Sequence, residues 1–505
     1  MSLLGVDVGT TGCKAALFRT DGRLLASAYE EYAYLAPQPG QAELDAPRVW
    51  EAIRRAIARA AAGGRSDPVS ALAVSSMGEA MVPVSADRRI LGPSLLNFDT
   101  RGQEYLAALR DRLSRDRLYS LNGNTLGNQY GLTKLMWLKE HRAALYGEAA
   151  LFLNWAGLVA FLLGGEPAVD HSLANRSLLF DLDRADWSAE LLAASGLDRA
   201  KLPKAVPSGS PLGTVSAQAA AELGLPRGTR IVAGAHDQCA NALGCGVTRE
   251  GDALLGMGTY LCIVPVLEGR PSPARMLEIG LNTEHHAVPG HFVCFIYNMG
   301  GALVKWYRDT FAAAEHHLAR ERGEDVYDRL FAELPDLPSE VLVLPHFSPT
   351  GPPEFIEDSS GVLAGLTLGT RRGEILQGIL QGALFGLKEC TDLLPRAGLD
   401  IRGYRVAGGG SKSDAWVQLA ADILDRPFVR PRVGEAGALG AAILAGAGTG
   451  VFASIEEGAR AMVALERTFE PDRARARQLA ERYVKYLRLW PALKELLRRP
   501  VSAAG

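Results

Sequence analysis

The most constraining feature of this sequence is an apolar run that turns abruptly into glycine, threonine and aspartate within Leu3–Lys14. A second apolar run follows at once, and Asp21-Gly22 then favours a tight turn. The pattern predicts strand, small-residue turn, strand, turn and strand. Glycines at 5, 9 and 12 let backbone N–H groups approach an anion, because no Cβ stands in the way. The first turn is therefore either a phosphate-binding loop or an ordinary glycine-rich hairpin.

Three side chains of this stretch suit a phosphate-binding loop. Thr10 and Thr11 bring hydroxyl donors to the turn. Asp7 stands at the end of the first predicted strand, where a carboxylate can hold a hydrated Mg²⁺ beside phosphates. We therefore interpret Asp7 as a candidate metal residue.

Composition limits the class of protein. A chain of 505 residues, 48% hydrophobic and 22% charged, predicts a globular protein of two to four domains. A net charge of −3 gives no indication of a nucleic-acid or membrane partner. The six cysteines form no CxxC pair and no signal-like segment opens the chain, so we expect reduced thiols and a cytoplasmic location.

The plan of the first stretch recurs near the middle of the chain. A strand and glycine-threonine turn are predicted at 253–259, followed by a strand at 260–266, which indicates a second domain beginning near Gly244. Periodicity predicts helices at 46–62, 133–141, 239–246, 374–394, 414–424 and 435–445, and a basic, solvated helical tail at 473–499. It predicts strands at 69–74, 81–84, 231–234, 404–407 and 428–431, and a loop entering an edge strand at 170–183.

Three glycine-rich turns follow predicted strands, at Gly9–Gly12, Gly256–Thr259 and Gly408–Gly410. The third is not a Walker A loop, because Ser411 and not glycine precedes the Lys-Ser pair. The other two lack the GxGxxG order of a dinucleotide fold. Together the three turns predict a polyphosphate site shared between two domains.

Several polar residues could carry chemistry, each with a structural alternative. Asp237 is either a base that accepts a proton from a hydroxyl or the N-cap of the following helix. Glu79 is either a polyol ligand or a solvated loop acid. Arg101 is a substrate contact, a helix-terminus contact or a surface charge. We interpret the histidines as a polar loop and not as a metal site, because no carboxylate accompanies them at ligand spacing. They are His285, His286 and His291.

From Leu3 to about Phe452 the chain resembles the FGGY family of carbohydrate kinases, xylulokinases in particular, within the actin-like ATPase superfamily. Each matching segment is weak alone, but their shared order is specific. The segments are Asp7–Gly12, Pro39–Asp45 with Trp50, Asp99–Arg101, Lys134–Trp137, Gly234–Gln238, Gly258-Thr259, Gly361–Leu366 with Glu374-Ile375, Gly408–Ser413 with Trp416 and Ala421-Asp422, and Glu435–Ala442.

The resemblance implies an α/β fold of two ribonuclease-H-like domains, 1–243 and 244–505, with ATP and sugar in the cleft between them. It implies that Asp237 is the catalytic base and that Asp7 lies near Mg²⁺. The implied sugar-site residues are Met77, Gly78, Glu79, Arg101, Asp237 and Gln238. The implied ATP-site residues are Thr10, Thr11, Lys14, Gly258, Thr259, Gly301, Gly409, Gly410 and Ser413.

The sequence departs from the xylulokinase pattern in the sugar site. Xylulokinases usually have Gln-Met-His-Gly where this chain has Met77-Gly78-Glu79-Ala80, and the usual Trp-Asn pair is Asn97-Phe98 here. Glu79 instead matches the polyol-binding glutamate of glycerol kinases, whose neighbouring arginine is Gly78 here.

These observations predict transfer of the γ-phosphoryl group of MgATP to a terminal hydroxyl of a small sugar, a ketopentose such as xylulose. Alternative acceptors are glycerol, erythritol, ribulose, fuculose and gluconate. A different class of function would be an actin-like or chaperone-like ATPase, or a sugar sensor without catalysis. A homodimer is a further expectation.

Overall fold

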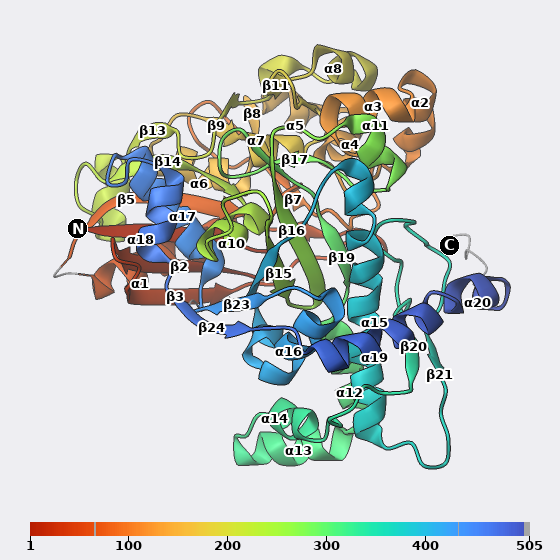
Figure 1. Ribbon diagram of the computed structural model, residues 1–505. Helices are drawn as coiled ribbons and strands as arrows, with labels where there is room; N and C mark the ends of the chain where they lie inside the picture. The colour runs from red at the N-terminus through yellow and green to blue at the C-terminus, as the bar shows by residue number, and fades with distance from the viewer. Residues whose placement is uncertain (65–66, 433, 499–505) are drawn as a thin grey trace.

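The structure is a computed structural model that describes residues 1–64, 67–432 and 434–498. Two large β-sheets, each flanked by helices, form the framework of the described residues, which have the predicted α/β fold (Figure 1). The first sheet comes from the N-terminal part of the chain, and the second comes from the middle and C-terminal parts.

The six-stranded first sheet has the order β13-β14-β5-β1-β2-β3. Strand β1 pairs antiparallel with β2 and parallel with β5, and β14 pairs parallel with β5. Val8 lies opposite Ser76, and Ser76 lies opposite His236, so three parallel strands end at the same edge. The strands are β13 (Pro211–Thr214), β14 (Arg230–His236), β5 (Val69–Ser76), β1 (Ser2–Val8), β2 (Gly12–Arg19) and β3 (Leu24–Glu31).

The predicted strand–turn–strand stretch at the N-terminus is confirmed, and its local causes are visible. The Gly9 N–H donates to the Gly12 carbonyl at 2.9 Å, which closes the first turn. Gly22 has φ 81°, a conformation that favours glycine, in the turn between β2 and β3. Helix α1 (Ala46–Gly63) follows as predicted, and the Asp45 side chain accepts from the Arg48 N–H at its N-terminus.

The second sheet repeats this plan, as the sequence predicts. Strand β15 pairs antiparallel with β16 and parallel with β22, in the way that β1 pairs with β2 and β5. The order is β17-β18-β16-β15-β22-β23-β24, with β19 also paired to β16. The strands are β17 (Glu284–His285), β18 (His291–Val293), β16 (Tyr260–Glu268), β15 (Asp252–Met257), β22 (Gly403–Ala407), β23 (Phe428–Pro431), β24 (Leu465–Phe469) and β19 (Ile296–Met299).

Two helices of small residues join the sheets. Helix α10 (Asp237–Gly244) packs on α17 (Ala436–Gly448), and α17 covers β1, β5 and β14 of the first sheet. Carbon added at Gly5, Gly244 or Gly440 would meet the backbone of the facing element, so the glycines permit this close contact. Both predicted helices are confirmed, whereas the domain boundary at residue 244 stays a prediction.

The structure corrects three expectations from the sequence. The 170–183 stretch is not only a loop and strand, because Asp170 accepts from the Ser172 and Leu173 N–H groups and begins a short helix there. The tail over 473–498 is two helices, and Leu479, Tyr483 and Tyr486 are buried in the second core; residue 499 lies outside the described part. His285 and His286 are buried, not part of a polar loop, with each Nε2 3.2 Å from a backbone carbonyl.

The remaining elements surround these sheets. The helices are α2 (Leu106–Arg112), α3 (Arg115–Asn122), α4 (Gly131–His141), α5 (Ala143–Glu148), α6 (Trp155–Leu163), α7 (His171–Asn175), α8 (Ala189–Ser195), α9 (Ala217–Leu223), α11 (Pro273–Glu278), α12 (Gly301–Phe311), α13 (Ala313–Arg322), α14 (Val326–Ala332), α15 (Arg372–Thr391), α16 (Asp414–Leu424), α18 (Ile455–Met462), α19 (Arg473–Tyr486) and α20 (Leu489–Leu497). Short paired strands are β4 (Glu43–Leu44) with β7 (Ser94–Leu95), β6 (Met81–Val84) with β8 (Leu151–Asn154), β9 (Ala168–Asp170) with β12 (Lys204–Val206), β10 (Phe180–Asp181) with β11 (Asp186–Trp187), and β20 (Leu342–Leu344) with β21 (Val362–Ala364).

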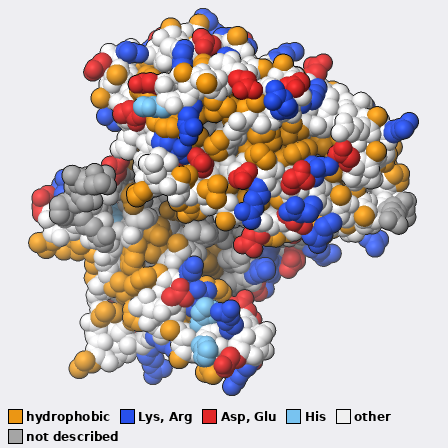
Figure 2. Space-filling model, turned by 180° about the vertical axis from the view of Figure 1, so that it is seen from behind, with side chains coloured by type: hydrophobic (Ala, Val, Ile, Leu, Met, Phe, Trp, Pro, Cys, Tyr) orange, Lys and Arg blue, Asp and Glu red, His pale blue; other side chains and the backbone are white. Residues whose placement is uncertain are grey.

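Positive and negative side chains alternate over the surface seen in Figure 2, in keeping with the small net charge. Within the described residues, no helix combines the length and the apolar character that crossing a bilayer requires.

Candidate active site

Three predicted site segments meet at the carboxyl edge of the first sheet. Asp7 lies near the end of β1, Met77–Glu79 follow β5, and Asp237 follows β14. The Met77 N–H donates to the Val8 carbonyl at 3.0 Å, which joins two of these strand ends directly. Parallel strands end at the same edge of a sheet, so the polar loops that follow them lie side by side. This explains why site residues that are far apart in the sequence meet here.

Asp237 is the first residue of α10, and His236 occupies the N-cap position, so the N-cap alternative for Asp237 is wrong. Burial, together with the negative charges of Asp7 and Glu79, raises the pKa of Asp237 to about 7. The side chain still exposes 27% of its surface, so a substrate can reach it. A carboxyl group with a pKa near neutrality suits proton exchange with a hydroxyl.

The His236 ring lies beside the Asp237 carboxylate. Its Nε2 lies 3.3 Å from Oδ1 of Asp237. Burial, followed by the nearby Arg176 charge, holds the pKa of His236 well below its usual range, so the ring is neutral. The backbone N–H of His236 donates to the Ser172 hydroxyl at 2.9 Å, which fixes this strand end.

Asp7 is held from two sides. The Ser75 hydroxyl donates to Oδ1 of Asp7 at 2.6 Å. A Cβ added to Gly437 at the start of α17 would lie 2.8 Å from Oδ2 of Asp7, so only glycine fits there without movement. Burial raises the pKa of Asp7, and a nearby divalent cation would favour its ionised form. The residues present therefore fit a hydrated Mg²⁺.

Glu79 is not a solvated acid, because its side chain is 10% exposed and paired with Arg176. Nε of Arg176 donates to Oε1 of Glu79 at 3.0 Å, and Nη2 donates to the same oxygen. Nη1 of Arg176 donates to Glu284, on β17 of the second sheet. Sequence reasoning missed Arg176 and Glu284, since no local pattern links positions so far apart in the chain.

The glycine turns of the second half also meet. The Gly301 N–H donates to the Gly258 carbonyl at 2.9 Å, and the Ala302 N–H donates to the Thr259 carbonyl at 3.0 Å. A Cβ on Gly410 would approach Met257 Cβ at 3.1 Å, so the turn containing Gly409 and Gly410 lies beside the end of β15. Ser413 caps α16, where its hydroxyl accepts from the Trp416 N–H at 3.3 Å.

The second half of the chain reaches the first half's acids through Arg176, which pairs with Glu79 and with Glu284 on β17 of the second sheet. The ring of Phe295, beside β19, lies 5.8 Å from the Arg176 guanidinium and 5.4 Å from the ring of His236. The second half therefore contacts the strand end where Asp237 lies.

The remaining predicted site residues are placed as follows. Thr10 is half-buried and Thr11 exposed in the turn between β1 and β2, and Gln238 is half-buried beside Asp237. Lys14 pairs with Glu435 across the two halves of the chain. Arg101 is not a surface charge, because its side chain is 8% exposed and pairs with Asp99 and Glu43.

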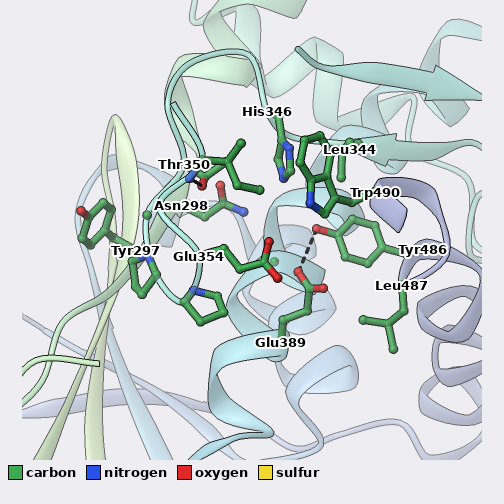
Figure 3. Close-up of a pocket in the computed structure, with 15 residues that line it drawn as sticks. Tyr297, Asn298, Leu344, His346, Thr350, Glu354, Glu389, Tyr486, Leu487 and Trp490 are labelled. Carbon is green, nitrogen blue, oxygen red and sulfur yellow. Dashed lines mark hydrogen bonds between the residues drawn. The ribbon is translucent and has the colours of Figure 1, made fainter. Parts of the chain in front are cut away.

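A separate pocket of about 80 Å³ lies in the second half of the molecule (Figure 3). Glu354 and Glu389 point into it, and the Tyr486 hydroxyl donates to Oε2 of Glu389 at 3.4 Å. Burial raises the pKa of Glu389 to about 7. Tyr297 lines this pocket, but none of the predicted site residues does so.

Comparison with known proteins gives a consistent result. Residues 2–244 match the N-terminal domain, and residues 279–449 the C-terminal domain, of the FGGY family of carbohydrate kinases. The chain is 31% identical to a glycerol kinase of Methylibium petroleiphilum, with 96% of this chain and 98% of the relative covered. It is 29% identical to the autoinducer-2 kinase of Escherichia coli, covering 93% and 90%. The crystal structure of xylulose kinase from Rhodospirillum rubrum aligns with a TM-score of 0.87 at 28% identity, covering 98% and 99%.

Proposed function

Since this chain belongs to the FGGY family of carbohydrate kinases, and is thus an ATP-dependent sugar kinase, we propose that it transfers the γ-phosphoryl group of MgATP to a terminal hydroxyl of a ketopentose such as xylulose. The observation that carries the proposal is Asp237, a partly exposed carboxyl group with a pKa of about 7, raised first by burial. It follows β14 at the edge where β1 and β5 also end, close to Asp7 and Glu79.

In the proposed mechanism Asp237 accepts the proton of the substrate hydroxyl as the new O–P bond forms and the bond to ADP breaks. The neutral His236 ring lies beside the accepting carboxylate, with its Nε2 3.3 Å from Oδ1. Backbone N–H groups of the turns at Thr259 and Gly409 would bind the phosphates, because glycine turns let them approach closely. Gly301 would support the first of these turns, since its own N–H donates to the Gly258 carbonyl. Mg²⁺ held near Asp7 would neutralise phosphate charge.

A second candidate acceptor is a polyol, and one observation favours it. Glycerol kinases pair their polyol-binding glutamate with a neighbouring arginine, and Gly78 stands in that position here. Arg176 nevertheless supplies a guanidinium to Glu79 from another part of the chain. The polyol-binding pair is thus present in chemical terms, although its arginine comes from beyond the end of α7.

The test is release of ADP from MgATP, measured with and without xylulose, ribulose, fuculose, gluconate, erythritol and glycerol. Sugar-dependent release in the wild type, lost in Asp237→Asn, would support the proposal. ADP release at the same rate with and without each sugar would favour the ATPase alternative, and no ADP release would favour a sugar sensor. Either result would refute the proposed transfer reaction.

A further inference from the structure

Arg176 occupies an unusual position between two acids. Its guanidinium donates to Glu79 along one edge and to Glu284 at another nitrogen. The side chains of Arg176, Glu79 and Glu284 are 13%, 10% and 1% exposed. The rings of Tyr130 and Phe295 lie 5.1 and 5.8 Å from the guanidinium carbon. The cation is therefore enclosed by aromatic rings and engaged by carboxylates.

This enclosure decides what Arg176 can bind. An arginine fork is the usual protein ligand for a substrate carboxylate. Here three of the five N–H donors, one each on Nε, Nη1 and Nη2, already bond protein carboxylates. Glu79 occupies the fork formed by Nε and Nη2, so that fork is not open to a substrate carboxylate and instead orients Glu79.

The hydrogen-bond acceptors of this cluster that have no partner among the described residues are carboxylate oxygens. Both bonds from Arg176 reach Oε1 of Glu79, and no hydrogen bond within the described residues engages its Oε2. Oε1 of Glu284 accepts from Arg176 and from Asn282 at 2.8 Å, whereas Oε2 is buried without a partner among those residues. A carboxylate oxygen accepts hydrogen bonds, so its natural ligand is a hydroxyl donor.

The other ionisable side chains close to Glu79 are mostly acids, like Glu79 itself. Asp237 lies within range of Asp7 and Glu79, and their charges raise its pKa after burial does. Two carboxylates, those of Glu79 and Glu284, contact the single guanidinium, so this cluster has more negative than positive groups. A second anion placed beside Glu79 would meet like charge in a partly enclosed site.

The fold makes room for this arrangement at Gly78. A Cβ at that position would lie 2.9 Å from Cγ of Arg176 and 3.1 Å from Nε2 of His236. The glycine that departs from the glycerol kinase pattern is therefore what admits Arg176 to the site.

We propose that the Glu79–Arg176–Glu284 cluster sets the acceptor specificity of this enzyme for neutral polyhydroxy compounds and excludes sugar acids. The inference rests on the proposed function in that it concerns the same acceptor site. Arg176 acts as a positioning residue that presents the free oxygen of Glu79 to substrate hydroxyls, and Glu284 keeps the guanidinium occupied.

The experiment measures equilibrium binding by titration calorimetry to the full chain without nucleotide. Each neutral probe is paired with an acid of the same carbon number: D-xylulose with D-xylonate, erythritol with D-erythronate, and glycerol with D-glycerate. We expect at least one neutral probe to bind, and we expect the acid paired with it to bind with at least about 100-fold lower affinity. An acid that binds as tightly as its neutral partner, or failure of every neutral probe to bind, would overturn the inference.

Two variants test the cluster itself. Arg176→Lys, which keeps the charge but loses the fork, should weaken binding of the neutral probe about tenfold while MgATP affinity stays within about twofold. Glu284→Gln, nearly identical in shape, should narrow the ratio of neutral to acid affinity. Glu190→Gln is the matched control, because that glutamate lies in an exposed ion pair with Arg117.

Unchanged sugar affinity in Arg176→Lys together with an unchanged ratio in Glu284→Gln would overturn the inference. Circular dichroism confirms that each variant is folded, and if Arg176→Lys does not fold, the Glu284→Gln ratio alone decides. Sugar binding without sugar-dependent ADP release would refute the kinase reaction yet leave the specificity inference standing, so the two failures are distinguishable.

Discussion

Replacing Gly437 by alanine should impair catalysis while the fold is retained. The added methyl would lie 2.8 Å from Oδ2 and 2.9 Å from Cγ of Asp7. Ordinary contact needs about 3.5 Å, so the carboxylate must move by roughly 0.7 Å. Asp7 cannot move freely, because Ser75 holds its other oxygen and β1 is paired on both sides.

The size of the effect follows from the displacement. A misplacement of about 1 Å near the chemistry costs up to about 10²-fold in rate, so a shift of roughly 0.7 Å predicts about a 30-fold fall in kcat. If Asp7 holds Mg²⁺, the Mg²⁺ concentration for half-maximal rate should also rise. Alanine favours helix over glycine by up to about 1 kcal/mol, which offsets part of the strain on α17.

The assay is steady-state ADP release across a Mg²⁺ titration, with a thermal melt of each variant. Gly147→Ala is the control, because a Cβ at that helical glycine would meet nothing within 4 Å. Asp7→Asn should give a larger loss than Gly437→Ala. A folded Gly437→Ala variant with wild-type kcat and Mg²⁺ dependence would refute the placement of Asp7 at the metal.

Further predictions concern the acids of the site. Asp237→Asn should lower kcat by about 10²-fold or more with unchanged MgATP affinity, and near-normal turnover would remove Asp237 from its role. Because the base must be deprotonated and its pKa is about 7, raised first by burial, kcat/KM should rise with pH up to about 7 and level off above; a flat profile between pH 5 and 8 contradicts this. Glu79→Gln should raise the sugar KM and, by removing a negative charge that raises the Asp237 pKa, move the inflection to lower pH; an effect on ATP binding alone would place Glu79 elsewhere. Ser75→Ala should raise the Mg²⁺ requirement through loss of the bond to Asp7, and an unchanged requirement would argue against that role.

Much of the fold could be predicted because the deciding signals are local. The small-residue turn after β1, the Asp45 cap of α1 and the glycine run of α17 each act within a few residues. The sequence also placed Asp7 and Asp237 at strand ends, and the structure shows that these parallel strands end at one edge.

The ion pairs of the site could not be predicted in the same way. Arg176 reaches Glu79 and Glu284 only because α7 and β17 pack together, and nothing near any of the three residues indicates that contact. His285 is likewise buried with its ring nitrogen Nε2 paired to the Leu182 carbonyl, which lies in another segment of the chain. Tertiary packing decides these positions, and a single sequence does not display it.

The packing of α17 on the first sheet has a consequence for protein synthesis. This helix is synthesised long after β1, β5 and β14, the strands that it covers. A nascent chain that ends before α17 would therefore hold an uncovered apolar face until that helix emerges. We expect a fragment ending at residue 244 to bind hydrophobic dyes and chaperones, and a monomeric fragment with a cooperative melt would contradict this.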